Sequence, residues 1–196
     1  MTTKKTTTKK KEVPARKSEQ IINQLLSDIE FATDVAPITW KSALGECGLT
    51  EEKAKKLKVN RGAENFLNQV ENQCLEYHCL LEANRYWMKI FSDFLGKNKG
   101  MYDDLMDKFD KYLSVEGPGN YRMKKGKVVR NEQGQVLLTQ HAEESRVEML
   151  GTFGTEFQEL INFYMNGKGN LEGLAKEKDR YEAAVRTLKN VIDFYK

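Results

Sequence analysis

One short segment of the chain has the residue types and spacing of a metal site. Cys74 and His78 are four residues apart, which would place them on one face of a helix, and Cys79 follows directly. Zinc binds thiolate and imidazole, but a structural zinc site needs four such ligands. No second cluster of this kind exists in the sequence, and Cys74 occupies an apolar position of a helical pattern. We therefore predict no metal site and no cofactor, and interpret Cys74 as a core residue.

The other candidates for catalysis are isolated side chains. Two glutamates follow His141 closely, but no motif ties a serine or cysteine nucleophile to this histidine. The adjacent carboxylates of Asp103 and Asp104 would diverge by about 100° on a helix, so they cannot share one acid–base site. The lysines at 124, 125 and 127 lack the spacing of a phosphate-binding P-loop. The sequence therefore predicts a protein that is not an enzyme.

Clusters of lysine and arginine offer a different chemistry, the binding of phosphate groups. The net charge of the 196-residue chain is +3, but residues 1–17 alone carry +6, so the remainder is mildly acidic. A Thr/Lys-rich segment with few apolar residues predicts a disordered tail, which either binds nucleic acid or only keeps the protein soluble. The residues predicted to contact duplex DNA or another polyanion are Lys4, Lys5, Lys9, Lys10, Lys11, Arg16, Lys17, Lys53, Lys55, Lys56, Lys58, Lys124, Lys125 and Lys127.

A long helix organises the rest of the chain. Residues 62–95 contain no proline and no internal glycine after Gly62, and their apolar residues recur at steps of three and four, as in a heptad seam. At 1.5 Å per residue this helix would be roughly 50 Å long. A rod of that length cannot bury its own apolar side, so we expect it to pack against other helices.

The last third of the sequence predicts two further long helices. They cover residues 142–165 and 170–196, and the glycine-containing turn 166–169 would join them as an antiparallel hairpin. Gly151 and Gly154 weaken the first of them, which indicates a break or a close helix crossing there. The seam residues expected to hold helices together within and between subunits are Leu67, Val70, Tyr77, Leu81, Met88, Phe91, Leu95, Tyr181, Val185, Leu188 and Ile192.

Residues 18–61 predict a small unit of three helices. Ser18, Thr39 and Thr50 are each placed to cap the start of one of them. Gly48 would take a left-handed turn between the second and third helices, and Leu49 would fill the core. This outline is that of a helix-turn-helix, although an ordinary helical corner with a solvated lysine face has the same pattern.

This segment resembles the N-terminal part of bacteriophage small terminase subunits. The resemblance covers about 30 residues and implies a ring-forming protein, in which a helix-turn-helix binds packaging-site DNA and a following helical hairpin makes the ring. It carries over to Lys53, Lys55, Lys56 and Lys58 as DNA contacts. The residues that carry it are Trp40, Lys41, Ala43, Leu44, Gly48, Leu49, Thr50, Glu51, Lys53, Ala54, Asn60, Gly62, Phe66 and Leu67.

Residues 121–140 have the sequence pattern of β-structure, unlike the helical segments around them. The segments 127–130 and 135–139 flank the sequence Asn-Glu-Gln-Gly, which predicts a β-hairpin with a four-residue turn. A lone hairpin is marginal in water, so this one should lie on a neighbouring subunit or on nucleic acid. The alternative is a surface hairpin without a function.

The predicted fold is thus all-α, a helical bundle with one β-hairpin. Its parts are the tail 1–17, the trihelical unit 18–61 and the bundle 62–196. The predicted function is a homo-oligomeric DNA-binding protein of phage DNA packaging, with other packaging proteins as partners. A structural virion component, such as a ring or adaptor, is the alternative, and a metal-linked helical regulator is a third. The odd number of cysteines, three, argues against a disulfide framework and predicts a reducing environment, the host cytoplasm or the virion. The sequence has no run of 18 apolar residues, which predicts no membrane span.

Overall fold

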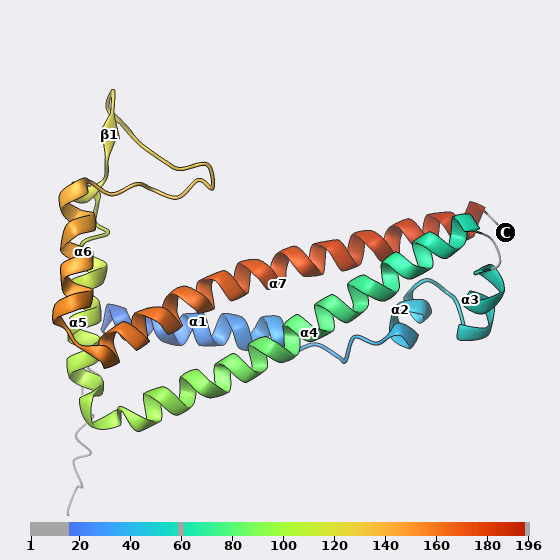
Figure 1. The fold of residues 1–196 in the computed structure, drawn as a ribbon, viewed down its shortest axis with the longest axis horizontal. Coiled ribbons are helices and arrows are strands. Elements are labelled where there is room, and N and C mark those ends of the chain that lie inside the picture. Colours follow the sequence, from blue (N-terminus) through green and yellow to red (C-terminus); the bar gives the residue numbers. More distant parts are fainter. Residues whose placement is uncertain (1–15, 59–60, 195–196) are drawn as a thin grey trace, which may run out of the picture.

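The structure is a computed structural model, which describes residues 16–58 and 61–194. The chain is mostly helical, with one small antiparallel sheet, and this confirms the predicted all-α class (Figure 1). Among the described residues no helix is long and apolar enough to cross a membrane. The helices are α1 (Lys17–Thr33), α2 (Trp40–Glu46), α3 (Glu51–Leu57), α4 (Arg61–Lys97), α5 (Tyr102–Ser114), α6 (Gln140–Thr152) and α7 (Thr155–Phe194), with single 3-10 turns η1 (Lys99–Met101) and η2 (Pro118–Asn120); the strands are β1 (Met123–Lys124) and β2 (Lys127–Val128).

Two long helices, α4 and α7, lie antiparallel along the whole length of the molecule (Figure 1). α4 has 37 residues and is therefore about 55 Å long, which confirms the single uninterrupted helix predicted over residues 62–95. α5 and α6 lie across one end of this hairpin, and α2 and α3 cover its other end. We refer to these as the elbow and the free end.

The predicted turn at residues 166–169 is wrong, because α7 continues through it. A Cβ atom on Gly167 would lie 2.7 Å from the Trp87 ring of α4 and 2.8 Å from Leu25 Cδ2 of α1. Glycine is therefore required here by the close approach of three helices, and it does not end one. Two glycines in four residues read as a turn in sequence, but burial of the helix outweighs their weak helix propensity.

The predicted helix 142–165 is interrupted, which is the first of the two alternatives, a break or a close helix crossing near Gly151 and Gly154. Gly154 has a φ of +93°, in the left-handed region, and it separates α6 from α7. The break changes the register of α6 against the core. As a result Val147 is 69% exposed, although a seam running unbroken through positions 147, 150, 154, 157, 161 and 164 would place it inward. Arg146 instead joins α6 to α5, since its guanidinium lies 4.3 Å from the centre of the Tyr112 ring.

The core is divided between the two ends of the hairpin. At the free end α2 and α3 pack on the first half of α4 and the second half of α7. At the elbow α1 and α5 pack on the other halves of the same two helices. The centre of the elbow core is aromatic, with the Phe91 and Phe163 rings stacked at 4.8 Å between centroids.

The three helices of residues 18–61 consequently do not form one unit. α1 belongs to the elbow core through Ile22, Leu25 and Ile29, whereas α2 and α3 belong to the core of the free end. The start of α1 is held by α5, because the Ser18 backbone N–H donates a hydrogen bond of 2.8 Å to Asp110 Oδ1. Ser18 is the second residue of the helix and not its N-cap.

The β-structure follows the prediction in part and adds to it. The predicted turn at residues 131–134 is present, because the Asn131 backbone N–H donates to the Gln135 carbonyl at 2.9 Å and Gly134 has a φ of +79°. The flanking segments pair irregularly, through a bridge between Arg130 and Val136 and a hydrogen bond of 2.9 Å from the Leu137 N–H to the Val129 carbonyl. The regular pairing of β1 with β2, through a two-residue turn at Lys125 and Gly126 that both have positive φ, was not predicted.

A hydrogen bond joins α2 to α7 at the free end. The Tyr181 hydroxyl donates to Glu46 Oε1 at 2.9 Å, and burial, followed by this bond, raises the pKa of Tyr181. We expect Tyr181→Phe to lower the free energy of unfolding by about 1.5 kcal/mol at pH 8. A raised tyrosine pKa stabilises the fold fully below about pH 10, and this stabilisation is lost as the pH rises above that value.

The measurement is urea unfolding of wild type and Tyr181→Phe between pH 8 and 11. The difference in free energy between them should shrink above pH 10. Tyr86→Phe is the matched control, because it makes the same chemical change on a side chain that is 65% exposed and keeps the ring, so it should change the free energy of unfolding by less than about 0.5 kcal/mol. A constant difference across the range would show that Tyr181 does not carry this pH dependence.

Candidate nucleic-acid interface

The corner formed by α2 and α3 has the local geometry that its sequence predicted. The Thr39 hydroxyl accepts a hydrogen bond from the Ser42 backbone N–H and caps α2, and the Thr50 hydroxyl accepts one from the Lys53 backbone N–H and caps α3. Gly48 has a φ of +69°, which a residue with a Cβ rarely adopts. Leu49 is buried, as predicted, and Ala43, Leu44 and Ala54 are buried beside it. The corner is therefore fixed to the hairpin by its buried side and presents its other side to solvent.

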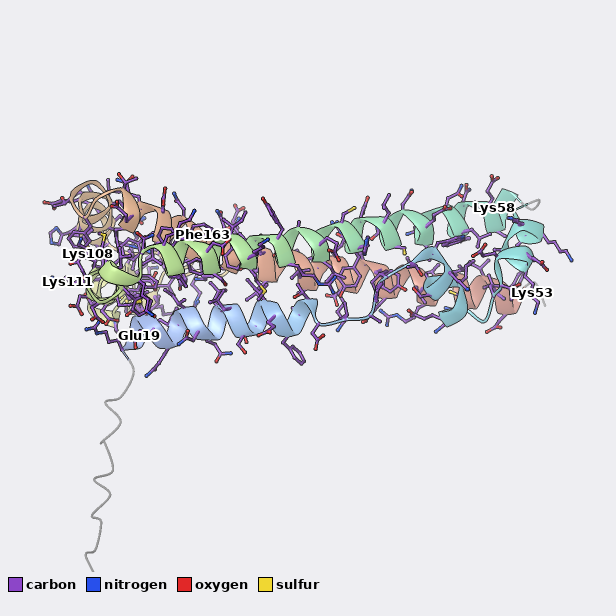
Figure 2. The ribbon with its side chains drawn as sticks, turned by 90° about the horizontal axis from the view of Figure 1, so that it is seen from below. Glu19, Lys53, Lys58, Lys108, Lys111 and Phe163 are labelled. Carbon is purple, nitrogen blue, oxygen red and sulfur yellow. The ribbon has the colours of Figure 1, made fainter. Side chains whose placement is uncertain are left out.

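The lysines of α3 lie on the solvent side of this corner. Lys53, Lys55 and Lys56 are exposed, whereas Lys58 Nζ lies 3.4 Å from Glu71 Oε2 of α4. Figure 2 shows Lys53 and Lys58 together at the free end of the rod. The first turn of α3 also holds two glutamates, so the positive charge is concentrated on its second turn.

The basic residues at the elbow have a different environment. Arg16 is engaged by α5, with Nη1 3.0 Å from Asp103 Oδ1 and Nε 3.5 Å from Asp107 Oδ1. Its predicted role as a phosphate ligand is therefore in competition with two carboxylates of the same chain. Lys17 is exposed at the start of α1. The other predicted tail contacts, Lys4, Lys5, Lys9, Lys10 and Lys11, lie outside the described residues.

The third basic cluster is on the small sheet. Lys124, Lys125 and Lys127 are exposed on β1, β2 and the turn between them, and Lys125 has a φ of 52°. The sheet projects beyond α5 and α6 at the elbow (Figure 1). It lies at the opposite end of the molecule from α3. The lysines of α3 and those of the small sheet therefore form two separate basic surfaces, which one chain does not bring together.

The side chains predicted to join subunits are buried within one chain. Met88 and Leu95 are partly buried, and the other nine seam residues are at most 6% exposed, all of them packed between α4, α7 and the helices that cover these two. Their burial needs no second copy, so the seam no longer argues for an oligomer. The nine are Leu67, Val70, Tyr77, Leu81, Phe91, Tyr181, Val185, Leu188 and Ile192.

The segment with metal-like spacing does not assemble a site. Cys74 is buried in the core of the free end, as predicted, and burial raises the pKa of its thiol. Cys79 is exposed, because it is five residues further along the helix and therefore on another face. Within residues 16–58 and 61–194 no three His, Cys, Asp or Glu side chains are close enough to hold a metal ion.

An open groove at the elbow was not predicted. It has a volume of about 680 Å³ and lies between the end of α4 and the start of α7. Its lining includes the apolar side chains of Ile90, Phe94 and Phe163. It also holds more acidic than basic residues, namely Asp93, Glu156 and Glu159 against Lys97. Since these residues come from helices far apart in the sequence, only Ile90 and Phe94, apolar residues of α4 outside its heptad seam, could have indicated the groove. This excess of negative charge would repel a polyanion, so the groove is not proposed as a second nucleic-acid surface.

The α2–α3 corner is thus the place where a fixed backbone and exposed lysines coincide. Comparison with known proteins adds no relative, because no family model, no curated protein and no solved structure matches the chain. The resemblance of residues 39–67 to small terminase subunits stays a prediction.

Proposed function

We propose that this protein is a non-enzymatic DNA-binding protein of the phage DNA-packaging type, which works as a homo-oligomer in the host cytoplasm or virion. The α2–α3 corner would contact duplex DNA as a helix-turn-helix. The observation that carries the proposal is the set of exposed lysines at 53, 55 and 56. Among the described residues none of these three has a carboxylate partner within 4.0 Å.

Unpaired lysines on a rigid support suit phosphate binding. A lysine without an ion pair stabilises the fold little, but it releases a counterion from DNA when it neutralises a phosphate. Ala54 on the inner side of α3 is 2% exposed, so the helix cannot turn its lysines away from a ligand. The corner also sits at the free end of the rod, where a duplex can approach it without meeting the elbow (Figure 1).

We expect the triple variant Lys53→Gln, Lys55→Gln, Lys56→Gln to bind duplex DNA at least tenfold more weakly at 50 mM salt. Each lost phosphate contact should reduce the slope of log K against log salt concentration by about 0.9, or about 2.7 for three contacts. Fluorescence anisotropy with a labelled 30-base-pair duplex between 50 and 200 mM salt measures both quantities.

The matched control is Lys124→Gln, Lys125→Gln, Lys127→Gln, which makes the same change of charge at the elbow. If this control loses affinity while the α3 variant does not, the contact lies on the sheet and the proposed corner is wrong. Deleting residues 1–17 measures the contribution of the tail separately. Failure of the wild-type protein to bind duplex DNA at 50 mM salt would contradict the proposal as a whole.

A structural component of a virion is a second candidate, and the small sheet favours it. Met123 is 55% exposed and Val128 is 38% exposed, both on a sheet that projects from the elbow (Figure 1). Exposed apolar side chains on such a projection suit insertion into a neighbouring protein. Deletion of residues 122–129 should then abolish assembly with that neighbour without changing DNA affinity, which co-sedimentation with assembled particles would test.

A further inference from the structure

The outer side of α4 carries an apolar stripe that the fold does not use. Leu75 is 62% exposed, Tyr86 is 65% exposed and Ile90 is 40% exposed, and Cys79 and Ala83 between them are also exposed. At 100° per residue these five side chains fall within an arc of about 80°. The buried seam of α4 lies on the opposite side of the helix. α4 thus has two apolar faces, and only one of them is covered in a single chain.

The stripe is also free of charge over a long distance. Between residues 65 and 90 the same arc holds only uncharged side chains, which are Asn65, Asn68 and Asn72 besides the five apolar ones. In a chain with 31% charged residues, the charged side chains of this part of α4 all lie outside the arc. In Figure 2, α4 runs along the upper edge of the rod from the free end to its middle, and α7 rises above it only toward the elbow.

We propose that a second copy of this chain covers the stripe, with the two α4 helices packed antiparallel about a two-fold axis near residue 81. This inference rests on the homo-oligomer of the proposed function and names its contact. The apolar residues are self-complementary about that axis. Leu75 comes opposite Tyr86 of the second copy, and the small Cys79 comes opposite the small Ala83, so the contact repeats on both sides of the axis.

The charges beside the stripe fit the same arrangement. Glu71 and Lys89 lie on the same flank of α4, and the two-fold axis sets each of them opposite the other residue of the second copy. The Glu71 carboxylate is already held on this flank by Lys58 of its own chain at 3.4 Å. A parallel arrangement would leave Glu71 of one copy and Lys89 of the other 18 residues apart along the helices, about 27 Å, so they would not attract each other. Charge therefore favours the antiparallel pair.

The test is the mass of the full-length protein in solution between 1 and 100 µM by analytical ultracentrifugation. The chain has a mass of 22.6 kDa, and we expect the wild type to form a dimer or a larger assembly that contains this contact. The double variant Leu75→Glu, Tyr86→Glu should lose the contact. Val147→Glu is the matched control, because Val147 is 69% exposed on α6 and lies away from the stripe. A wild type that stays monomeric at 100 µM, or a double variant that assembles as the wild type does, would overturn the proposal.

Two further measurements identify the arrangement. Cys79 is exposed whereas Cys47 and Cys74 are buried, so a short bismaleimide should cross-link two chains through Cys79 and fail with Cys79→Ser. Glu71→Lys and Lys89→Glu should each weaken the dimer, and the two together should restore it. Lack of rescue would exclude the antiparallel pairing.

DNA binding of the double variant separates this inference from the proposed function. A monomeric wild type that binds duplex DNA would remove the interface and leave the DNA-binding proposal. If the wild type is a dimer that the stripe variants dissociate, but it does not bind duplex DNA, the interface would stand and the DNA-binding proposal would be lost.

Discussion

Phe91→Ala is expected to lower the free energy of unfolding by about 3–5 kcal/mol, the range for a fully buried phenylalanine. The Phe91 side chain is 0% exposed. Its ring centroid lies 4.8 Å from that of Phe163 of α7, on which it stacks, and 5.4 Å from that of Trp87. Alanine would leave a cavity at the centre of the elbow core, where α1, α4, α5 and α7 meet. Since small domains are stable by about 5–15 kcal/mol, this single change removes a large part of the total.

Urea unfolding followed by circular dichroism measures this effect, and Phe31→Ala is its matched control. Phe31 is 84% exposed on α1, so the same substitution there should change the free energy of unfolding by less than about 0.5 kcal/mol. A loss below about 1 kcal/mol for Phe91→Ala would mean that the aromatic cluster does not hold the elbow together.

Gly167→Leu is expected to destabilise the protein by about 3 kcal/mol, whereas the same change two residues later should stabilise it. At Gly167 even a Cβ atom would lie 2.7 Å from the Trp87 ring, and that ring is packed against Phe91 and Phe163 and cannot withdraw freely. The larger side chain must therefore separate α7 from α4 and α1, which is the cost of overpacking a core.

The control for this change is Gly169→Leu in the same helix. Gly169 is exposed, and a Cβ there would meet no atom within 4 Å. Leucine at that position gains only the higher helix propensity, about 0.8 kcal/mol relative to glycine. Thermal unfolding should thus show opposite shifts of the melting temperature for the two variants. Equal shifts would contradict the close helix crossing at Gly167.

Local signals in the sequence were sufficient for the helical class and for much of the candidate site. α4 was predictable because apolar residues at helical spacing and the absence of proline act within one segment. The turn at Gly48 and the threonine caps of α2 and α3 were predictable for the same reason, since each depends on a few neighbouring residues. The exposed lysines of α3 follow from the buried position of Ala54 in the same two turns.

The ion pairs of Arg16 with α5 could not be predicted from local sequence. Its sequence neighbours are basic and predict a phosphate ligand, but its partners Asp103 and Asp107 lie about ninety residues away. The same holds for the groove at the elbow, whose walls belong to α4 and α7. Contacts of this kind depend on how the helices are arranged in space, and no local pattern records them.

By itself, the sequence of this protein determined where most helices begin, which of their faces are apolar, and where its positive charge lies. The tertiary structure alone decided that α7 passes through Gly167, that α1 packs at the opposite end from α2 and α3, and that the seam is buried within one chain. The physical reason is that a glycine or an apolar stripe has the same local properties in every context. Whether it becomes a turn, a helix crossing or a subunit contact depends on the side chain that meets it, as the Trp87 ring meets Gly167.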